Sequence, residues 1–230
     1  MNRRETTRNR QSDPPRAGGR GALQPIVLPK PTPGRGKSVF AALQSRKTVR
    51  SISDKKISRQ MLSNLLWSAS GVNRKKGPFG IPGRTAGSAS NSQEIDLYIA
   101  MEEGVFIYEP VPHRLTPVVA EDVRALAIGE GQGKMGAKAP VRLIYVVDIE
   151  KFSKAGFQEP GLWNLETQKS YYFVDTGLVA GNVYLFAASN GLAAWFHNCN
   201  KEKLSARLGL APSQRALFGQ TVGYADKDGG

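Results

Sequence analysis

The longest regular pattern in the chain spans residues 167–190, where apolar side chains recur at the spacing of an α-helix, as at Tyr172, Val179 and Phe186. Gly177 and Gly181 lie one turn apart on this segment. Residues without a side chain allow a second helix to approach closely. The segment also holds more apolar residues than one small core requires. We therefore expect a long helix at the centre of a domain or along a dimer axis.

Shorter patterns surround this helix and indicate the fold class. Helical spacing appears at residues 39–46, again from a Ser58 cap to Gly71, and at 121–128 and 201–208. Strand patterns appear at residues 95–99, 105–108, 141–147, 193–197 and 217–225, the first two as a hairpin. Helices come first, then the hairpin, and then helices and strands alternate. This mixed order predicts an α+β fold rather than a doubly wound parallel sheet.

Composition limits the class of protein. A chain of 230 residues fits one domain with a substantial core. No apolar run approaches the ~18 residues of a membrane span, and no secretory signal is evident. Cys199 is the single cysteine, and His113 and His197 are the two histidines, so neither a disulfide framework nor a His-based metal centre is expected. These features favour a soluble protein of the reducing cytoplasm.

The positive charge is concentrated near the N-terminus. Residues 1–50 hold 12 Lys or Arg and two acidic residues, whereas the other 180 residues hold 20 basic and 17 acidic ones. We expect residues 1–36 to form a disordered basic tail and linker, and residues 37–226 to form the folded domain. Residues 26–28 are the only apolar island in the tail and could lie across the body or a partner subunit. A nucleic-acid-binding arm is the alternative, but no aromatic residue is interleaved with the charges to stack on bases.

Two polar segments could bind a ligand. Alternate residues of an extended segment point the same way, so Arg46, Thr48 and Arg50 can converge on one anion such as a phosphate. The alternative is a solvated basic patch. Residues 84–93 form a small, polar, glycine-containing loop that leads into a strand, and such a loop can approach a planar polar ligand closely. The alternative is a plain loop.

Motifs of several other enzyme classes are missing from the chain. It contains no G-x-G-x-x-G after a strand, no Walker loop, no G-x-S-x-G and no H-E-x-x-H. Spacing alone therefore excludes several kinds of chemistry and identifies none.

An ordered series of motifs resembles one family. The series consists of Arg46-Lys47-Thr48-Val49-Arg50, Leu62-x-x-Leu65-Leu66-Trp67-x-Ala69-x-Gly71, Arg84-Thr85-Ala86-x-Ser88-Ala89-x-Asn91-x-Gln93, Gly104-Val105-Phe106-x-Tyr108, Ala139-Pro140, Gly181-Asn182-x-x-Leu185-x-Ala187-Ala188-x-x-Gly191-Leu192 and Val222-Gly223-Tyr224. It resembles the FMN-dependent nitroreductases, most closely the subgroup related to azoline-oxidising flavoenzymes of peptide-modification clusters. The resemblance covers residues 38–225 in the expected order.

The resemblance implies a fold and a set of flavin contacts. The fold is a sandwich with a central, mostly antiparallel sheet flanked by helices, assembled as an intertwined homodimer with FMN at the interface. The flavin contacts that it implies are Arg46, Lys47, Thr48 and Arg50 from one subunit, Ser88, Ala89 and Asn91 from the other, Gln132 at the flavin edge, and His197, Asn198 and Cys199 near the reactive N5. Gly87 stands where the family usually has proline. Residues 151–170 could form a mobile lid over the flavin.

The implied reaction is a ping-pong transfer of electrons from NADH or NADPH through FMN to a nitroaromatic, a quinone or a similar small acceptor. Hydride enters and leaves at the flavin, so no acid or base of the protein is obligatory, and His197 and Cys199 are interpreted as structural. One alternative is an azoline-type dehydrogenase that oxidises a peptide and passes electrons to oxygen. Another is a non-catalytic flavin-binding or nucleic-acid-associated protein. No membrane partner is expected.

Overall fold

The computed structural model describes residues 22–32, 34, 36–132, 136 and 138–226. Of the disordered tail and linker expected at residues 1–36, residues 1–21, 33 and 35 lie outside the described residues. The α-helices are α1 (Val39–Ser45), α2 (Arg59–Ser70), α3 (Leu165–Ser189) and α4 (Lys201–Leu208). The strands are β1 (Ile26–Val27), β2 (Val72–Arg74), β3 (Gly83–Arg84), β4 (Ile95–Met101), β5 (Gly104–Glu109), β6 (Arg114–Val119), β7 (Val141–Asp148), β8 (Ala193–His197) and β9 (Gln214–Gly223).

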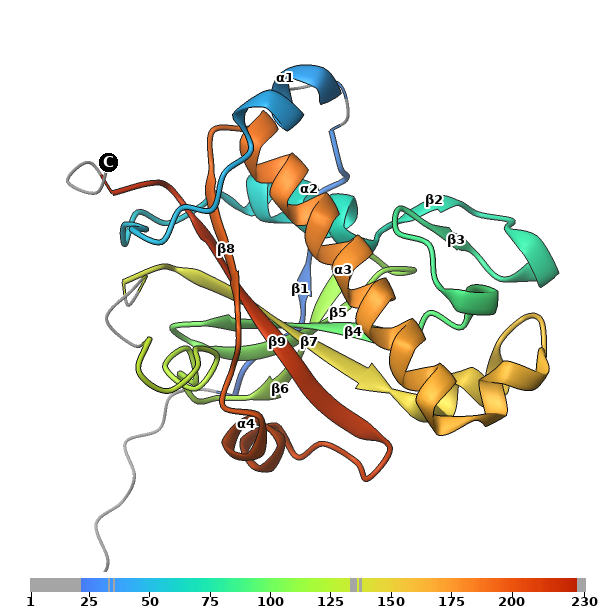
Figure 1. Ribbon diagram of the computed structural model, residues 1–230. Coiled ribbons are helices and arrows are strands. Elements are labelled where there is room, and N and C mark those ends of the chain that lie inside the picture. The colour runs from blue at the N-terminus through green and yellow to red at the C-terminus, as the bar shows by residue number, and fades with distance from the viewer. Residues whose placement is uncertain (1–21, 33, 35, 133–135, 137, 227–230) are drawn as a thin grey trace, which may run out of the picture.

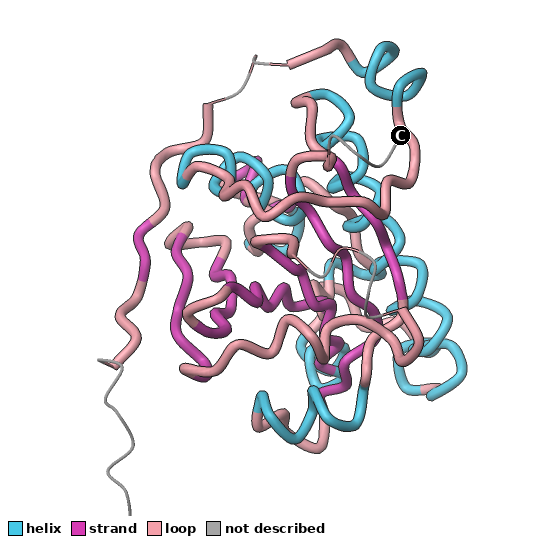
Figure 2. The backbone as a smooth tube through the Cα atoms, turned by 90° about the vertical axis from the view of Figure 1, so that its left-hand side faces the viewer, coloured by secondary structure: helices cyan, strands magenta, loops and turns pink. Residues whose placement is uncertain are grey.

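Seven strands form one sheet in the order β1-β6-β5-β4-β7-β9-β8, and every pairing in it is antiparallel. The helix α3 crosses one face of this sheet diagonally (Figure 1). The expected α+β sandwich with a mostly antiparallel sheet is therefore confirmed. The apolar island of residues 26–28 lies on the body, because β1 pairs with β6 and Leu28 is buried. Figure 2 shows this N-terminal segment along one side of the molecule.

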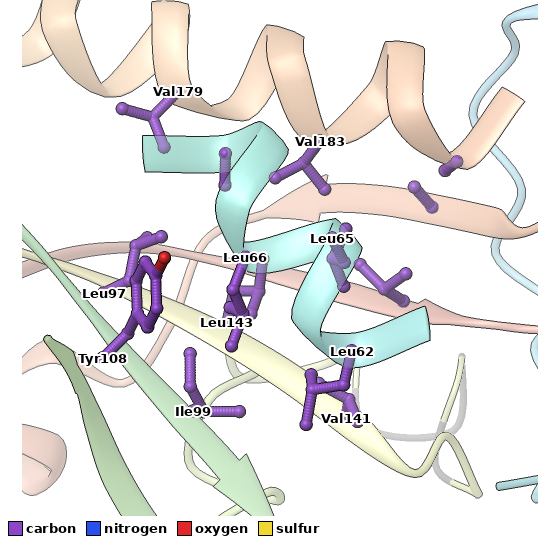
Figure 3. Close-up of a cluster of buried hydrophobic side chains, with 14 of the residues drawn as sticks. Leu62, Leu65, Leu66, Leu97, Ile99, Tyr108, Val141, Leu143, Val179 and Val183 are labelled. Carbon is purple, nitrogen blue, oxygen red and sulfur yellow. The ribbon is translucent and has the colours of Figure 1, made fainter. Parts of the chain in front are cut away.

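The larger core lies between the sheet and the helices α2 and α3. The helix α2 buries Leu62, Leu65 and Leu66 against the strands, and Val179 and Val183 of α3 approach from the other side (Figure 3). Because successive strand residues point to opposite faces, β4 and β7 give every second side chain to this core. Burying apolar side chains stabilises the fold by about 1.5 to 3 kcal/mol for each large residue.

The opposite face of the sheet carries a smaller core. The intervening side chains of β4 and β7, such as Ala100 and Ile144, pack there against Leu204 and Leu208 of α4 and against Val123. Helices therefore cover both faces of the sheet, as a sandwich requires. Burial on both faces also explains why β7 is a continuous apolar run in the sequence.

The helix ends follow local capping rules. Ser58 caps α2 by accepting the backbone N–H of Met61 at 3.1 Å, and the helix ends at Gly71. At α4, Gly209 adopts the left-handed conformation that ends many helices. The predicted limits of α2 and α4 are therefore confirmed.

The prediction of a helix at residues 121–128 is wrong, because the structure has turns there. The Asp122 carboxylate accepts the backbone N–H of Arg124 at 3.1 Å and pairs with its guanidinium at 2.7 Å. The buried guanidinium of Arg142 donates a hydrogen bond to the carbonyl oxygen of Arg124. Side-chain partners thus replace the hydrogen bonds that a helix would form.

Three other parts of the chain hold structure that the sequence patterns do not predict. The connection between α2 and β4, which includes the expected loop at residues 84–93, contains the small β2–β3 hairpin and two short 3-10 turns. Residues 151–170 hold two further 3-10 segments, and they bury Phe152 and Leu162 in a third apolar cluster. Strand β6, which includes Pro117, was not expected; it pairs with the short edge strand β1.

Across the residues that the structure describes, no helix combines the length and the apolar character needed to span a bilayer.

Candidate functional site

The segment 46–50 follows the end of α1 and runs in an extended conformation along the outer edge of β8. The N–H of Val49 donates to the carbonyl oxygen of Ala194 at 3.0 Å. Arg46, Thr48 and Arg50 are exposed on either side of this bond. The segment therefore presents two guanidiniums and a hydroxyl to solvent from a backbone that the sheet holds in place. Lys47 is exposed among them.

Tyr184 of α3 positions this segment, a role that no pattern in the sequence predicts. The guanidinium carbon of Arg46 lies 5.4 Å from the centre of the Tyr184 ring. The tyrosine hydroxyl accepts the N–H of Phe196 at 2.8 Å and lies 3.2 Å from the Thr48 hydroxyl oxygen. The Arg50 guanidinium carbon lies 6.0 Å from the Trp195 ring centre. Helix α3 and strand β8 thus position both arginines.

His197 is held as a neutral ring at the end of β8. Burial lowers the pKa of His197 to about 4, the hydrogen bond with Asn198 partly opposes this shift, and the positive charge of Arg142 adds to it. Its Nδ1 lies 2.8 Å from the carbonyl oxygen of Asn198, which can only accept, so Nδ1 carries the proton. Nε2 therefore accepts the hydroxyl of Thr221 at 2.8 Å. Both ring nitrogens are occupied within the fold, which supports the structural interpretation of this residue.

Cys199 is likewise suited to packing rather than reaction. It is buried, and burial raises the pKa of the Cys199 thiol to about 11, so the thiolate is scarce at neutral pH. Its backbone N–H donates to Oδ1 of Asn198 at 3.0 Å. Asn198 is exposed. The backbone of residues 197–199 is consequently fixed by its own side chains.

Gln132 lies opposite this segment. Its N–H donates to the carbonyl oxygen of Gly129 at 3.1 Å, and its side chain lines a hollow of about 560 Å³ together with Asn198 and Cys199. The side-chain oxygen of Gln132 is buried and has no hydrogen-bond partner among the described residues. A buried acceptor of this kind is available to a hydrogen-bond donor on a ligand.

The loop at residues 88–93 is tightly constrained. The hydroxyl oxygen of Ser88 accepts the N–H of Gln93 at 3.0 Å, and the N–H of Ala89 donates to the Asp175 carboxylate at 2.9 Å. Ser90 and Asn91 have positive φ angles of 50° and 56°, which are uncommon outside glycine. The Asn91 side-chain nitrogen is buried without a partner among the described residues. Strain together with an unused donor is typical of a ligand-binding loop.

The structure does not bring this loop to the arginine segment within one chain. The loop is bound to Asp175, whereas the arginine segment is bound to Tyr184, nine positions further along α3. Nine residues of α-helix separate two positions by about 14 Å along the axis and place them on opposite sides of it. In Figure 1 the β2–β3 hairpin that leads to the loop lies across α3 from β8. Within one chain the two candidate binding segments therefore lie apart, and we term each of them a candidate half-site.

The outer surface of α3 carries exposed apolar side chains. Phe173, Val174 and Leu178 are 38%, 60% and 48% exposed, and a Cβ atom added at Gly177 or Gly181 would meet no atom of the described residues within 4 Å. The helix α1 packs against α3 and exposes three further apolar residues: Val39, Phe40 and Leu43. Exposed apolar side chains on neighbouring helices are typical of a contact site for another molecule. We term these exposed residues of α1 and α3 the α1–α3 face.

Comparison with known proteins gives one consistent result. The sequence profile described as the Nitroreductase family matches residues 43–224. A protein of Methanocaldococcus jannaschii, provisionally named a nitroreductase, is 29% identical over 157 residues, which cover 65% of this chain and 73% of that protein.

Solved structures give the same picture of the fold. A provisionally named nitroreductase from Ralstonia eutropha superposes with a TM-score of 0.76 and 28% identity, covering 89% of this chain and 91% of that one. A chain of the Escherichia coli microcin synthetase complex, solved with a truncated pro-MccB17 bound, has a TM-score of 0.62 and 18% identity over 85% of this chain and 77% of that one. At that identity the second likeness concerns the fold alone.

Proposed function

Because this chain belongs to the Nitroreductase family, we propose that it is an FMN-dependent oxidoreductase that passes electrons from NADH or NADPH to a nitroaromatic, a quinone or a similar small acceptor. Family membership and fold support a flavin-dependent oxidoreductase in general. The finer proposal rests chiefly on one observation, the pair of exposed arginines that lie against Tyr184 and Trp195 on one extended segment.

The exposed side chains of the arginine segment suit a phosphorylated, polyhydroxylated ligand. We propose that Arg46 binds the FMN phosphate through charge-assisted hydrogen bonds, with Lys47 adding positive charge. Thr48 offers a hydroxyl to the ribityl chain. Arg50 lies near Trp195 and is proposed to face the pyrimidine edge of the ring. A cation at that edge stabilises negative charge that appears there on reduction.

The remaining residues of the half-site are proposed to shape the flavin pocket. The amide of Gln132 would bind the pyrimidine edge, and the fixed backbone at His197, Asn198 and Cys199 would lie against the central ring near N5. Bound FMN supplies the redox chemistry, accepting a hydride from the nicotinamide and passing electrons to the acceptor. The protein binds and orients the ring and needs no ionisable side chain at the reacting atom. This agrees with the neutral His197 and the protonated Cys199.

We further propose that the protein is a homodimer in which each flavin contacts both subunits. The half-site with Ser88, Ala89 and Asn91 is separated from the arginine half-site along α3, and the α1–α3 face between them is exposed and apolar. A two-fold axis through this face would bury the apolar surface and could place the loop of one chain beside the arginines of the other. The buried free thiol also fits the reducing cytoplasm that we propose as its location.

The visible spectrum of the purified protein tests the proposed function. We expect a yellow protein with one FMN per subunit, which NADH or NADPH bleaches under anaerobic conditions and which a quinone or nitroaromatic re-oxidises. The same assay without a nicotinamide donor is the control. A colourless protein that does not take up FMN in a titration would exclude the proposal. If FMN binds but neither NADH nor NADPH reduces it, the protein is a flavin-binding protein and the proposed nicotinamide-dependent activity is excluded.

A further inference from the structure

Two carboxyl groups lie beneath the loop at residues 88–93. Glu94 directly precedes β4 and is fully buried, and Asp175 in the middle of α3 is 5% exposed. One oxygen of Glu94, Oε2, accepts the hydroxyl of Ser92 at 2.6 Å. The other, Oε1, is buried and has no donor among the described residues. A buried carboxylate oxygen without a donor is costly.

Asp175 faces the same space but is better satisfied. Its Oδ2 accepts the backbone N–H of Ala89 at 2.9 Å, which links the loop directly to α3. The side chains of Glu94 and Asp175 lie within hydrogen-bonding range of each other. Two ionised carboxylates can only accept, so a hydrogen bond between them requires a proton on one of them. With that proton, the unpaired oxygen of Glu94 becomes a hydroxyl that can donate a hydrogen bond to Asp175.

We infer that Glu94 and Asp175 share one proton, and that this proton fastens the flavin-facing loop to α3, making Glu94 a positioning residue. The inference rests on the proposed function only in giving the loop a flavin to contact. The proton resides on Glu94, because Asp175 already receives an N–H that stabilises its negative charge. The Glu94 carboxyl then donates to Asp175, and Asp175 holds Ala89.

The electrostatic surroundings keep the proton in place at neutral pH. Burial, together with the negative charge of Asp175, raises the pKa of Glu94 to about 8, and the Ser92 hydroxyl only partly offsets this. Burial also raises the pKa of Asp175, against the opposing effect of the Ala89 N–H. Both shifts favour one proton over none in the pair.

Charged groups on the neighbouring elements are engaged elsewhere. On α3, the pKa of Tyr171 is raised mainly by its hydrogen bond to Glu159 and also by the negative charge of Asp175. On β4, Asp96 is paired with Lys151 at 2.6 Å and lies in the field of Arg84. From the end of β7, Asp148 contributes its backbone N–H to the Glu94 carbonyl oxygen at 2.9 Å.

The consequence is a loop that loosens as pH rises. Opening of the loop admits water and returns the pKa of Glu94 towards its ordinary value of 4.5. Closure is therefore strongest below about pH 4.5 and weakens as the pH rises to about 8, where the closed pair itself loses its proton. Above that pH the open and closed states bind equal numbers of protons, and closure weakens no further. Flavin affinity falls with the binding-competent fraction, so we expect it to weaken by up to about tenfold from pH 7 to pH 9.

Two measurements on the full-length protein test this inference. Amide hydrogen exchange reports opening of residues 85–93, with β4 as an internal reference for the intrinsic effect of pH on exchange. Titration with FMN at the same pH values reports the flavin affinity. The informative variant is Glu94→Gln, because a glutamine amide donates to Asp175 at every pH and still accepts from Ser92. The matched control is Glu103→Gln, the same change at an exposed glutamate.

We expect the wild type and Glu103→Gln to lose loop protection relative to β4 as the pH rises from about 5 to about 8, with no further loss above about pH 9, and to bind FMN up to about tenfold more weakly at pH 9 than at pH 7. Glu94→Gln should show neither change. A loop whose protection follows β4 at all pH values, or a Glu94→Gln variant with the wild-type pH profile, would overturn the inference. If no variant binds FMN at any pH, the proposed function fails, and the exchange data still decide whether the shared proton fastens the loop.

Discussion

At the scale of single residues, Arg46 is the side chain whose proposed role is easiest to test. It is exposed and is held by the Tyr184 ring rather than by an acidic partner. We expect Arg46→Ala to weaken FMN binding by about 1.5 to 3 kcal/mol, the usual effect of losing a hydrogen bond to a charged group. Fluorescence titration with FMN measures the change.

A control separates this effect from a general loss of positive charge. Arg114→Ala removes an exposed arginine on β6, which is paired with Glu109 at 2.8 Å. It should leave the FMN affinity unchanged. Equal affinities for wild type and Arg46→Ala, with the fold intact by circular dichroism, would return Arg46 to the alternative of a solvated basic patch.

His197 gives a prediction about stability and pH. Burial lowers the pKa of His197 to about 4, below the ~6.5 of an unfolded histidine. Its contribution is thus fully present above about pH 6.5 and is lost as the pH falls towards 4, because the unfolded chain then binds a proton that the fold does not. The loss is about 3 kcal/mol. Urea unfolding at pH 7 and pH 4.5 should show most of it.

The variant His197→Asn keeps a donor for the Asn198 carbonyl oxygen but cannot titrate, so the difference between wild type and variant isolates this residue from other groups. We expect the wild type to lose more stability than the variant on acidification. Parallel pH profiles for the two proteins would mean that the pKa of His197 is the same in the folded and the unfolded chain.

Residues also show where prediction from sequence stops. Arg46, Thr48 and Arg50 were recognisable because they lie close together in the chain and alternate in an extended segment. Tyr184 and Asp175 each act on a segment more than eighty positions away. Inside a long helix they resemble ordinary core residues, and no spacing rule connects them to their partners. The unpaired oxygen of Gln132 is likewise visible only once the chain is folded.

At the scale of elements, patterns with a clear local cause were predictable. The cap at Ser58 and the left-handed Gly209 fixed the limits of α2 and α4. The turn at residues 121–128 was mistaken for a helix because its competitor, the buried Arg142, lies on a different strand. Strand β6 was missed because an edge strand with a proline carries a weak pattern.

The element with the most testable surface is α3. We propose that Gly177 lies in the dimer contact, because no atom of the described residues lies within 4 Å of a Cβ built there. A leucine at this position should be tolerated by the isolated chain, because Gly→Leu raises helix propensity. It should obstruct close approach of a partner. We therefore expect Gly177→Leu to keep its circular dichroism spectrum while losing mass in analytical ultracentrifugation and losing bound flavin.

A replacement elsewhere on the surface provides the comparison. Arg207→Leu adds the same side chain to the exposed side of α4, away from the α1–α3 face. It should remain dimeric. If Gly177→Leu also stays dimeric and keeps its flavin, the contact proposed through α3 is wrong.

At the scale of the whole molecule, a site divided between subunits couples flavin binding to assembly. Obligate interfaces commonly bury upwards of ~2,000 Å², so dissociation should cost the fold as well as the site. We expect that dilution releases FMN in step with the appearance of monomer. Sedimentation and flavin fluorescence on the same dilution series measure both. A stable monomer that retains FMN would refute the shared site and every role given to Asn91.

The edge of the sheet at β8 has a further consequence. Free strand edges invite pairing with other chains, and here the Val49 N–H and the Tyr184 hydroxyl occupy that edge. The segment that covers this edge is also the one proposed to bind the cofactor. Its backbone bond to β8 forms without any ligand, so loss of the cofactor alone would leave the edge covered. A substitution that frees residues 46–50 from β8 would instead open the edge to strands of neighbouring chains, and the same change that weakens flavin binding would then promote aggregation.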